Sequence, residues 1–553
     1  MALVLSDSDQ WQGERLSDEE FDYIVVGAGS AGCVLAARLS EDPATRVLLL
    51  EAGPEDRSLW IHLPIGYGKT MWDDKVNWRF STEPDAGMNG RRIYWPRGKT
   101  LGGSSSINGL IYIRGQRQDY DHWAALGNAG WGYDDVLPYF IKSEGNVRGA
   151  DAFHGGSGPL KVSDITTRDP LIDAFVAGAG ELGVPATRDF NGAAQEGAGY
   201  YQLNTWNGWR VSTAKAYLAP ARHRANLQVR TGAFAAGIDF TGKRASGVRF
   251  RHGGTMHAAR ARREVLLSAG SIQSPQLLQL SGIGPAPLLR EHGIAVVHEA
   301  PGVGENLQDH LQIRLTYEST RPTTNDQLGS WLGQARLALQ WLLHRSGALA
   351  VGINQGGCFM RALPEEAATP DIQFHVATLS ADMAGGKLHP FSGFTFSTCQ
   401  LRPESRGHVR IRSADPFEAP AMQANYLATD LDRRTTVAGV RAARAIAASK
   451  AMRPFVAREF KPGPGAETDA ELLEYCRDHG ATIFHPTGTC RMGADAAAVL
   501  DDRLRVRGVD GLRVVDCSAM PTLVSGNTNA PAVMMAEKAA DMIREDGRQQ
   551  SAS

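Results

Sequence analysis

The sequence predicts an α/β protein built on a doubly wound, mostly parallel sheet, with a second domain of α+β character that contains an antiparallel sheet. Three observations support this class. The chain begins with a strand, a glycine turn, a helix and a second strand. A strand followed by a long helix returns near the end, and the stretch between carries mixed patterns. Because 553 residues exceed what one hydrophobic core accommodates, we expect two domains.

The N-terminal unit consists of apolar runs on either side of a glycine turn. The run Phe21–Val26 precedes GAGSAG, the helical pattern CVLAARLSE follows, and RVLLLEAG has the pattern of a buried strand. Parallel strands need a crossover helix between them. This order therefore predicts the first half of a doubly wound sheet.

Later segments return to the same sheet. Strands are expected within Leu227–Arg251 and Arg262–Ala269, followed by a helix over Gln273–Leu280. Near the end, GLRVVDCSAMP is strand-like and APAVMMAEKAADMIRE has helical periodicity. We therefore expect a discontinuous first domain, and the predicted boundaries are 19–150, 225–314 and 476–547 for this domain and 151–224 and 315–475 for the second.

Composition argues against several classes of protein. A formal net charge of -2 provides no basic surface for nucleic acid. The six cysteines form no CxxC pair, so neither a zinc site nor a disulfide framework is indicated. The N-terminal stretch MALVLSDSDQWQGERLSDEEF lacks the basic region and the apolar run of a secretion signal. Free thiols and the lack of a signal predict a cytoplasmic protein.

No apolar stretch approaches the roughly 18 residues that span a bilayer. The nearest membrane feature is Trp331–Leu343 (WLGQARLALQWLL), which predicts an amphipathic helix. Such a helix faces a protein core or a subunit partner more often than lipid, and peripheral membrane contact and oligomeric state stay open. The polar end GRQQSAS predicts a frayed tail.

The glycine turn has the spacing of a dinucleotide-binding fingerprint. Gly27, Gly29 and Gly32 form GxGxxG between a strand and a helix. The first glycine permits the turn, the second lets backbone N–H groups approach a pyrophosphate, and the third lets helix and strand pack closely. Glu51 ends the second strand, where a carboxylate would accept hydrogen bonds from the ribose hydroxyls. The fingerprint alone does not distinguish FAD from NAD.

The chain contains four longer motifs, which are GKTLGGSSSINGLIYIRG, GSIQSPQLLQLSGIG, PGVGENLQDH and FHPTGTCRMG. In sequence and in order they resemble the glucose-methanol-choline oxidoreductase family, and the resemblance runs from about Phe21 to Met542. The resemblance implies that the first domain binds FAD. The small residues of LGGSSSIN would let the backbone lie against the flat flavin ring. Relatives with covalent flavin carry a histidine just before this asparagine, whereas this chain has Ile107, so noncovalent FAD is expected.

The fingerprint and the resemblance together give a set of residues expected along the cofactor. Asp516 is expected at the ribityl chain or at a backbone N–H near the flavin, with helix capping as the alternative. The complete set is Gly27, Gly29, Ser30, Ala31, Gly32, Glu51, Ala52, Trp78, Arg97, Thr100, Gly102, Gly103, Asn108, Gly109, Leu110, Ile111, Ala235, Asp516, Thr528 and Asn529.

The reaction expected from the resemblance is alcohol oxidation, which needs a base for the hydroxyl proton while hydride leaves to the flavin. His485 is the candidate base, because an imidazole suits proton transfer near neutrality and FHPTGT resembles the family's catalytic histidine. Asn527, 42 residues later, occupies the second catalytic position and would hydrogen-bond the substrate oxygen. A turn residue in GNTNAP is the alternative role of Asn527.

The substrate is expected to be an uncharged primary alcohol. Choline-oxidising relatives carry a glutamate two residues after the LQDH histidine, and this chain has Gln312 there. An amide provides no charge attraction for a quaternary ammonium. The residues expected to line the pocket are Phe484, Gln312, Trp331, Asn354 and Gln355.

Several alternatives stay open. The electron acceptor is expected to be a quinone, and molecular oxygen, which would make the protein an oxidase, is the alternative. Hydroxynitrile lyases share the fold and use only the base. Light-driven fatty-acid decarboxylases fit poorly, because they lack a histidine at His485 and carry a cysteine where this chain has Leu401.

Overall fold

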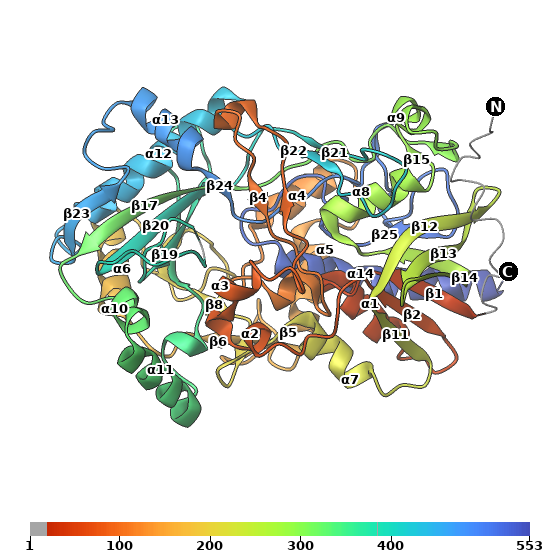
Figure 1. Ribbon diagram of the computed structural model, residues 1–553, viewed down its shortest axis with the longest axis horizontal. Helices are drawn as coiled ribbons and strands as arrows, with labels where there is room; N and C mark the ends of the chain where they lie inside the picture. The colour runs from red at the N-terminus through yellow and green to blue at the C-terminus, as the bar shows by residue number, and fades with distance from the viewer. Residues whose placement is uncertain (1–18, 384, 553) are drawn as a thin grey trace, which may run out of the picture.

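The computed structural model describes residues 19–383 and 385–552. Two seven-stranded sheets dominate the fold, and they form the cores of two lobes that lie side by side in Figure 1. Most of the N-terminal stretch that was inspected for a secretion signal lies outside the described residues. No helix of the described residues is long and apolar enough to cross a membrane.

The first sheet, on the right in Figure 1, is the predicted doubly wound sheet. Its strands run in the order β11-β2-β1-β14-β13-β12, and β25 pairs with β14. All pairings among β11, β2, β1, β14 and β25 are parallel, whereas β12 and β13 form an antiparallel extension. The strands are β1 (Glu20–Val26), β2 (Val47–Glu51), β11 (Leu227–Thr231), β12 (Ala233–Thr241), β13 (Arg244–His252), β14 (Thr255–Leu267) and β25 (Leu512–Val514).

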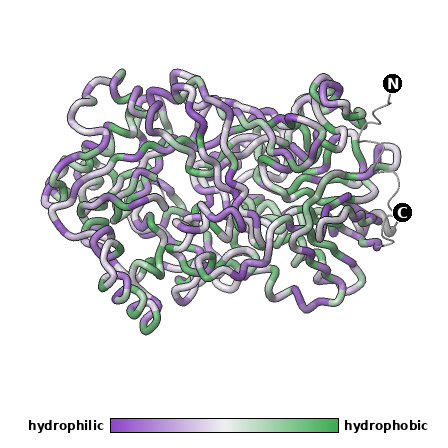
Figure 2. The backbone as a smooth tube through the Cα atoms, viewed as in Figure 1, coloured by the Kyte–Doolittle hydropathy of each residue, from purple (hydrophilic) through white to green (hydrophobic). Residues whose placement is uncertain are grey.

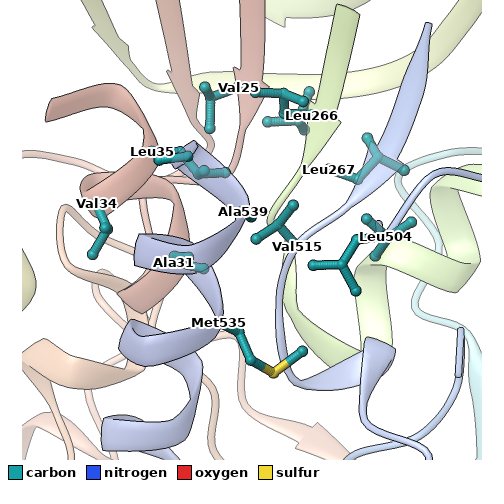
Figure 3. Packing of buried hydrophobic residues seen from close by; sticks show 14 of the residues in the cluster. Val25, Ala31, Val34, Leu35, Leu266, Leu267, Leu504, Val515, Met535 and Ala539 are labelled. Atoms are coloured by element: carbon teal, nitrogen blue, oxygen red, sulfur yellow. The ribbon is translucent and has the colours of Figure 1, made fainter. Parts of the chain in front are cut away.

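Two helices from opposite ends of the chain cover one face of this sheet. Helix α1 (Ser30–Leu39) and helix α14 (Asn529–Ala552) pack together, and Figure 3 shows Val34 and Leu35 of the first near Met535 and Ala539 of the second. Strands β1 and β2 are almost continuously apolar because both faces of a parallel sheet are buried. This packing explains why the N- and C-terminal sequences build one domain.

The second sheet is entirely antiparallel and runs in the order β23-β17-β20-β19-β18-β7, with β24 beside β17. Helices α6 and α12 pack on one face of it. The elements are α6 (Pro170–Glu181), β7 (Gly197–Tyr200), β17 (Leu311–Ser319), β18 (Asn354–Met360), β19 (Ile372–Ala377), β20 (Gly393–Gln400), α12 (Asp430–Ala447), β23 (Val456–Lys461) and β24 (Ala481–Thr482).

Shorter elements connect and cover the two lobes. The helices are α2 (Leu59–His62), α3 (Tyr67–Thr70), α4 (Arg117–Ala125), α5 (Tyr133–Ser143), α7 (Ala219–Ala221), α8 (Gly270–Leu280), α9 (Ala286–Glu291), α10 (Thr324–Gly329), α11 (Trp331–His344) and α13 (Asp469–His479). The strands are β3 (Phe80–Ser81), β4 (Tyr94–Trp95), β5 (Glu144–Asn146), β6 (Leu160–Asp164), β8 (Gln202–Leu203), β9 (Thr205–Trp206), β10 (Trp209–Arg210), β15 (Ile283–Gly284), β16 (His298–Glu299), β21 (His408–Arg410) and β22 (Ala421–Gln423).

The fold class predicted from the sequence is confirmed, and the differences are local. Helix α8 begins at Gly270, three residues before the predicted start, because the glycine already turns the chain into the helix. The polar end predicted to fray continues α14 to Ala552, so that prediction was wrong for the described part of the tail. The exact domain boundaries stay a prediction, and β17 crosses the one placed between 314 and 315.

Helix α11 forms where the amphipathic segment was predicted, and it projects from the second lobe at the lower left of Figure 1. Only Leu337 and Trp341 are buried on it, whereas Trp331 is 76% exposed and Leu343 64%. Green stretches mark this helix in Figure 2. Among residues 19–383 and 385–552, no core packs against its main apolar face, and a subunit partner or a lipid surface stays a prediction.

Candidate active site

A large cavity runs between the two sheets and receives residues from both lobes. Most residues that the sequence placed along a cofactor or substrate line it. From those sets the cavity is lined by Gly27, Gly29, Ser30, Ala31, Glu51, Ala52, Trp78, Arg97, Gly103, Asn108, Gly109, Leu110, Ile111, Ala235, Asp516, Thr528, Asn529, Phe484, His485, Asn527, Gln312 and Asn354.

The glycine turn at the carboxyl end of β1 forms one end of the cavity. Gly27 has a φ of +96°, and a Cβ on Gly32 would lie 1.8 Å from the Gly27 carbonyl oxygen, so both positions require glycine. A Cβ on Gly29 would meet nothing closer than 3.8 Å, which leaves the backbone open to a ligand. The first turn of α1 therefore presents unpaired N–H groups to the cavity, as a pyrophosphate requires.

Glu51 ends β2 beside this turn. Its side chain is buried and accepts hydrogen bonds from the backbone N–H groups of Ala28 at 2.9 Å and Gly53 at 2.8 Å. Burial raises the pKa of the Glu51 carboxyl to about 7, against the lowering effect of these two donors. A carboxyl without a cation at bonding distance has oxygen lone pairs left for ligand hydroxyls.

The loop between Gly98 and Gly109 lies against the glycine turn from the other side. Gly103 has a φ of +51°, and a Cβ there would approach the Cα of Gly29 to 2.7 Å. Asn108 accepts hydrogen bonds from the Leu110 N–H and from Arg210. Ile107 also lines the cavity and has no atom that could form a bond to flavin. The two glycine-rich backbones thus form a narrow cradle that fits a flat ring and its phosphate chain.

Asp516 performs the alternative role predicted for it and lines the cavity as well. Its side chain accepts hydrogen bonds from the Gly270 N–H at the start of α8, from the Ser274 hydroxyl and from the Ser518 N–H. It therefore caps two helical segments, which leaves its lone pairs largely engaged by protein donors.

The candidate base, His485, is fixed by its backbone. Phe484 before it has a φ of +72°, an unusual value for a bulky residue, and its carbonyl accepts a hydrogen bond from Arg97 at 2.7 Å. The His485 N–H donates to Asp309 at 2.7 Å. Two contacts from remote segments thus hold a strained turn that directs the imidazole into the cavity.

The hydrogen bonds around His485 determine its tautomer. The Oδ1 of Asn527 accepts from Gln373 at 3.3 Å, so its Nδ2 donates to Nε2 of His485 at 3.2 Å. The Nδ1 of His485 lies 3.0 Å from Nδ1 of His310, whose Nε2 donates to the Leu401 carbonyl at 2.9 Å. His310 must therefore accept at Nδ1, and His485 carries its proton on Nδ1. This assignment leaves the Nε2 lone pair of His485 beside Asn527 in the cavity.

Burial keeps these histidines neutral. It lowers the pKa of His485 well below its usual range, and the nearby His310, His375 and Arg97 lower it further. The pKa of His310 falls to about 4 and that of His375 to about 3, mainly by burial. Neutral imidazoles can accept a proton, so the cluster is suited to a base rather than to an acid.

Two residues predicted to line the pocket do not reach it. Trp331 lies on the exposed face of α11, so its placement in the pocket was wrong. Gln355 follows Asn354 on β18, and because neighbouring strand residues point to opposite faces, its side chain turns away toward Thr378. Three residues predicted to bind the cofactor do not line the cavity but pack beside residues or segments that do. They are Gly32, Thr100 and Gly102.

Sequence reasoning assigned no role to several residues that line the cavity or, like His310, contact a residue that lines it. His310 belongs to the quoted LQDH motif, which was a usable signal. His375 and Arg314 lie on strands β19 and β17, and Tyr67 lies on the short helix α3. These three carry no motif. The pairing of β17, β20 and β19 brings Arg314 and His375 to one face, and Tyr67 lines the same cavity from α3.

This chain is similar to known proteins over most of its length. The family profile named GMC oxidoreductase matches residues 21–312 with its N-terminal part and 403–536 with its C-terminal part. Human mitochondrial choline dehydrogenase is 44% identical over 96% of this chain and 90% of its own. An alcohol dehydrogenase (acceptor) from Pseudomonas putida is 43% identical over 95% of each chain.

Solved structures extend the similarity to the fold. Pyridoxine 4-oxidase from Mesorbium loti matches with a TM-score of 0.87 and 31% identity, over 95% of this chain and 99% of that one. Formate oxidase matches with a TM-score of 0.90 and 25% identity, over 96% and 99%. The glycine cradle, Glu51 and the His485 and Asn527 pair thus lie in a fold shared along the whole chain. This chain belongs to the GMC oxidoreductase family and is an FAD-dependent enzyme that acts on CH–OH donors.

Proposed function

We propose that this protein oxidises a primary alcohol to the aldehyde, with His485 as the base. The observation that carries the proposal is the unprotonated Nε2 of His485, which lies 3.2 Å from the Asn527 amide in the cavity. FAD bound there would accept the hydride, which is the chemistry that flavins supply. The cradle at Gly29 and Gly103 and the carboxyl of Glu51 would hold it without a covalent bond.

The protein's own groups carry out the proton chemistry. The substrate hydroxyl would occupy the space beside Nε2 of His485 and Nδ2 of Asn527, so that one group accepts its proton and the other donates to its oxygen. Protonated His485 keeps its Nδ1–H bond to His310, which strengthens once the donor carries charge. His310 is neutral and therefore does not repel the new cation.

The proposal also covers the electron acceptor and the location. We infer a quinone-type acceptor, as the name of the Pseudomonas putida relative permits, whereas a Vibrio vulnificus relative with 43% identity is named oxygen-dependent choline dehydrogenase. The exposed apolar face of α11 would suit peripheral contact with a quinone-containing membrane. The described cysteines are all free thiols, which supports the predicted cytoplasmic location.

The experiment is anaerobic mixing of the purified holoenzyme with a panel of primary alcohols and choline while the flavin absorbance is followed. We expect alcohols to bleach the flavin in the native protein and not in His485→Ala. Readmitted oxygen that reoxidises the flavin at once would identify an oxidase instead. An FAD-loaded protein that no alcohol bleaches would contradict the proposal and favour the lyase reaction.

A further inference from the structure

One face of the second sheet lines the cavity, and it carries an arginine that forms no ion pair with any described residue. Arg314 on β17 lies on the same face as Gln312, opposite Ser397 of β20, and Ser397 in turn pairs with His375 of β19. Gln312, Arg314, Ser397 and His375 all line the cavity. The substrate side of the cavity is therefore polar, with a guanidinium on β17, the first of the three neighbouring strands β17, β20 and β19.

No carboxylate of the described residues forms an ion pair with Arg314. Its Nε donates to Gln312 Oε1 at 3.2 Å and its Nη1 to the Asp382 carbonyl at 3.3 Å. The Asp382 carboxylate itself pairs with Lys461 at 2.6 Å and with His389 at 3.3 Å. Burial lowers the pKa of Arg314, and the phenols of Tyr67 and Tyr475 act in the opposite direction. Arg314 in turn helps to lower the pKa of His375.

Two buried arginines elsewhere in the described chain are paired with acids. Arg114 bonds Glu144 at 2.7 Å and Arg513 bonds Glu264 at 2.5 Å. Two further arginines near the cavity use their donors on the protein, since Arg210 contacts three oxygens and Arg97 bonds two carbonyls. Arg314 uses two of its five N–H donors and forms no ion pair with a described carboxylate. Of the three unpaired arginines, Arg314 is the one on the sheet that forms the substrate side of the cavity.

We infer that Arg314 is a substrate-binding residue that receives a carboxylate, so that the preferred substrate is a primary alcohol bearing an acid group at its far end. This inference rests on the proposed function and refines the expectation of an uncharged alcohol. The planar guanidinium matches a carboxylate with two parallel hydrogen bonds, which an ammonium does not.

The geometry determines the length of the substrate and the sign of the charge that it carries. The Arg314 and His375 positions are two strand spacings apart, roughly 9.5 Å, and His375 lies close enough to His485 to lower its pKa. A straight chain of about six carbons is therefore the starting choice. Amino alcohols and choline would place a second cation against Arg314, which would repel them. Gln312 does not offset this repulsion, because its amide carries no negative charge.

The test compares three substrates of similar length, and they are 6-hydroxyhexanoate, 1-hexanol and 6-amino-1-hexanol. In the native holoenzyme we expect kcat/KM to fall in that order, with roughly 10- to 100-fold between the first two, as a charge-assisted pair implies. Arg314→Leu should abolish this preference mainly through KM, and Arg314→Lys should retain part of it. Arg441→Gln, at an exposed ion pair on α12, is the matched control.

A binding measurement separates this inference from the proposed function. Hexanoate, which has no hydroxyl to oxidise, should bind the native holoenzyme at least about 10-fold more tightly than hexanamide in calorimetry, and Arg314→Leu should remove the difference. Equal binding of the two compounds to the native protein would overturn the inference, and so would equal losses for all three alcohols in Arg314→Leu. If no alcohol bleaches the flavin but hexanoate still binds selectively, the proposed alcohol oxidation is refuted. The carboxylate site at Arg314 then still stands.

Discussion

Replacing His310 by leucine tests whether a second histidine fixes the proton on the base. In the native protein Nδ1–H of His485 donates to Nδ1 of His310 at 3.0 Å, and this bond leaves Nε2 unprotonated beside Asn527. Leucine removes the acceptor, and His310 is fully buried, so no bulk water replaces it. The protonated state of His485 then loses a charge-assisted hydrogen bond.

The expected loss follows from that bond. A hydrogen bond to a charged group contributes about 1.5–3 kcal/mol, and each 1.36 kcal/mol of barrier corresponds to a factor of about ten in rate. Flavin reduction should therefore slow by roughly 10- to 150-fold in His310→Leu. His310→Gln, whose amide oxygen can accept the same proton, should lose less.

The assay is single-turnover flavin reduction in an anaerobic stopped-flow instrument at saturating alcohol. Thermal unfolding and flavin content of each variant show whether the fold survives. His252→Gln, an exposed histidine on β13, is the matched control and should react like the native protein. A His310→Leu protein with intact flavin that reduces within twofold of the native rate would refute the assigned tautomer.

Three further predictions concern the cofactor and the pH. Gly103→Ala places a methyl group 2.7 Å from the Gly29 Cα, so the purified variant should retain little FAD by absorbance, whereas Gly90→Ala, with a φ of +72° and open space, should retain it; equal retention would contradict the cradle. Glu51→Gln presents an amide N–H₂ toward donors or ribose hydroxyls, and the FAD dissociation constant should rise roughly 10-fold or more; an unchanged constant would remove Glu51 from the site. Because the pKa of His485 is lowered, the base stays neutral as the pH falls through 6.5, so the rate of flavin reduction should stay level there and decline only in more acidic buffer; a decline centred above 6.5 would show a higher pKa.

The sequence predicted those features whose residues lie within one short segment of the chain. The GxGxxG turn, Glu51 and the LGGSSSIN loop were visible because each role depends on glycines or on a strand end at fixed spacing. His485 and Asn527 needed the resemblance, since neither residue has a pattern of its own. The sheet order and the return of α14 to α1 matched the expectation that parallel strands share one buried sheet.

The substrate side could not be predicted in the same way. Gln312 was found because it lies next to a motif. Arg314 and His375 come together only through the pairing of β17, β20 and β19, and this pairing has no local sequence pattern. Trp331 was misplaced because an apolar helix pattern predicts packing without saying against what. The tautomer of His485 depends on Gln373 and Leu401, which lie far from it in the chain.

The most direct test of the central claim is anaerobic flavin reduction by an alcohol deuterated at the carbinol carbon, with the native protein and with His485→Ala. If hydride leaves from that carbon, the deuterated alcohol should bleach the flavin of the native protein more slowly. If His485 is the base, neither alcohol should bleach the flavin of the variant. Equal rates for both alcohols with chemistry limiting, or an unchanged rate in His485→Ala, would contradict the account.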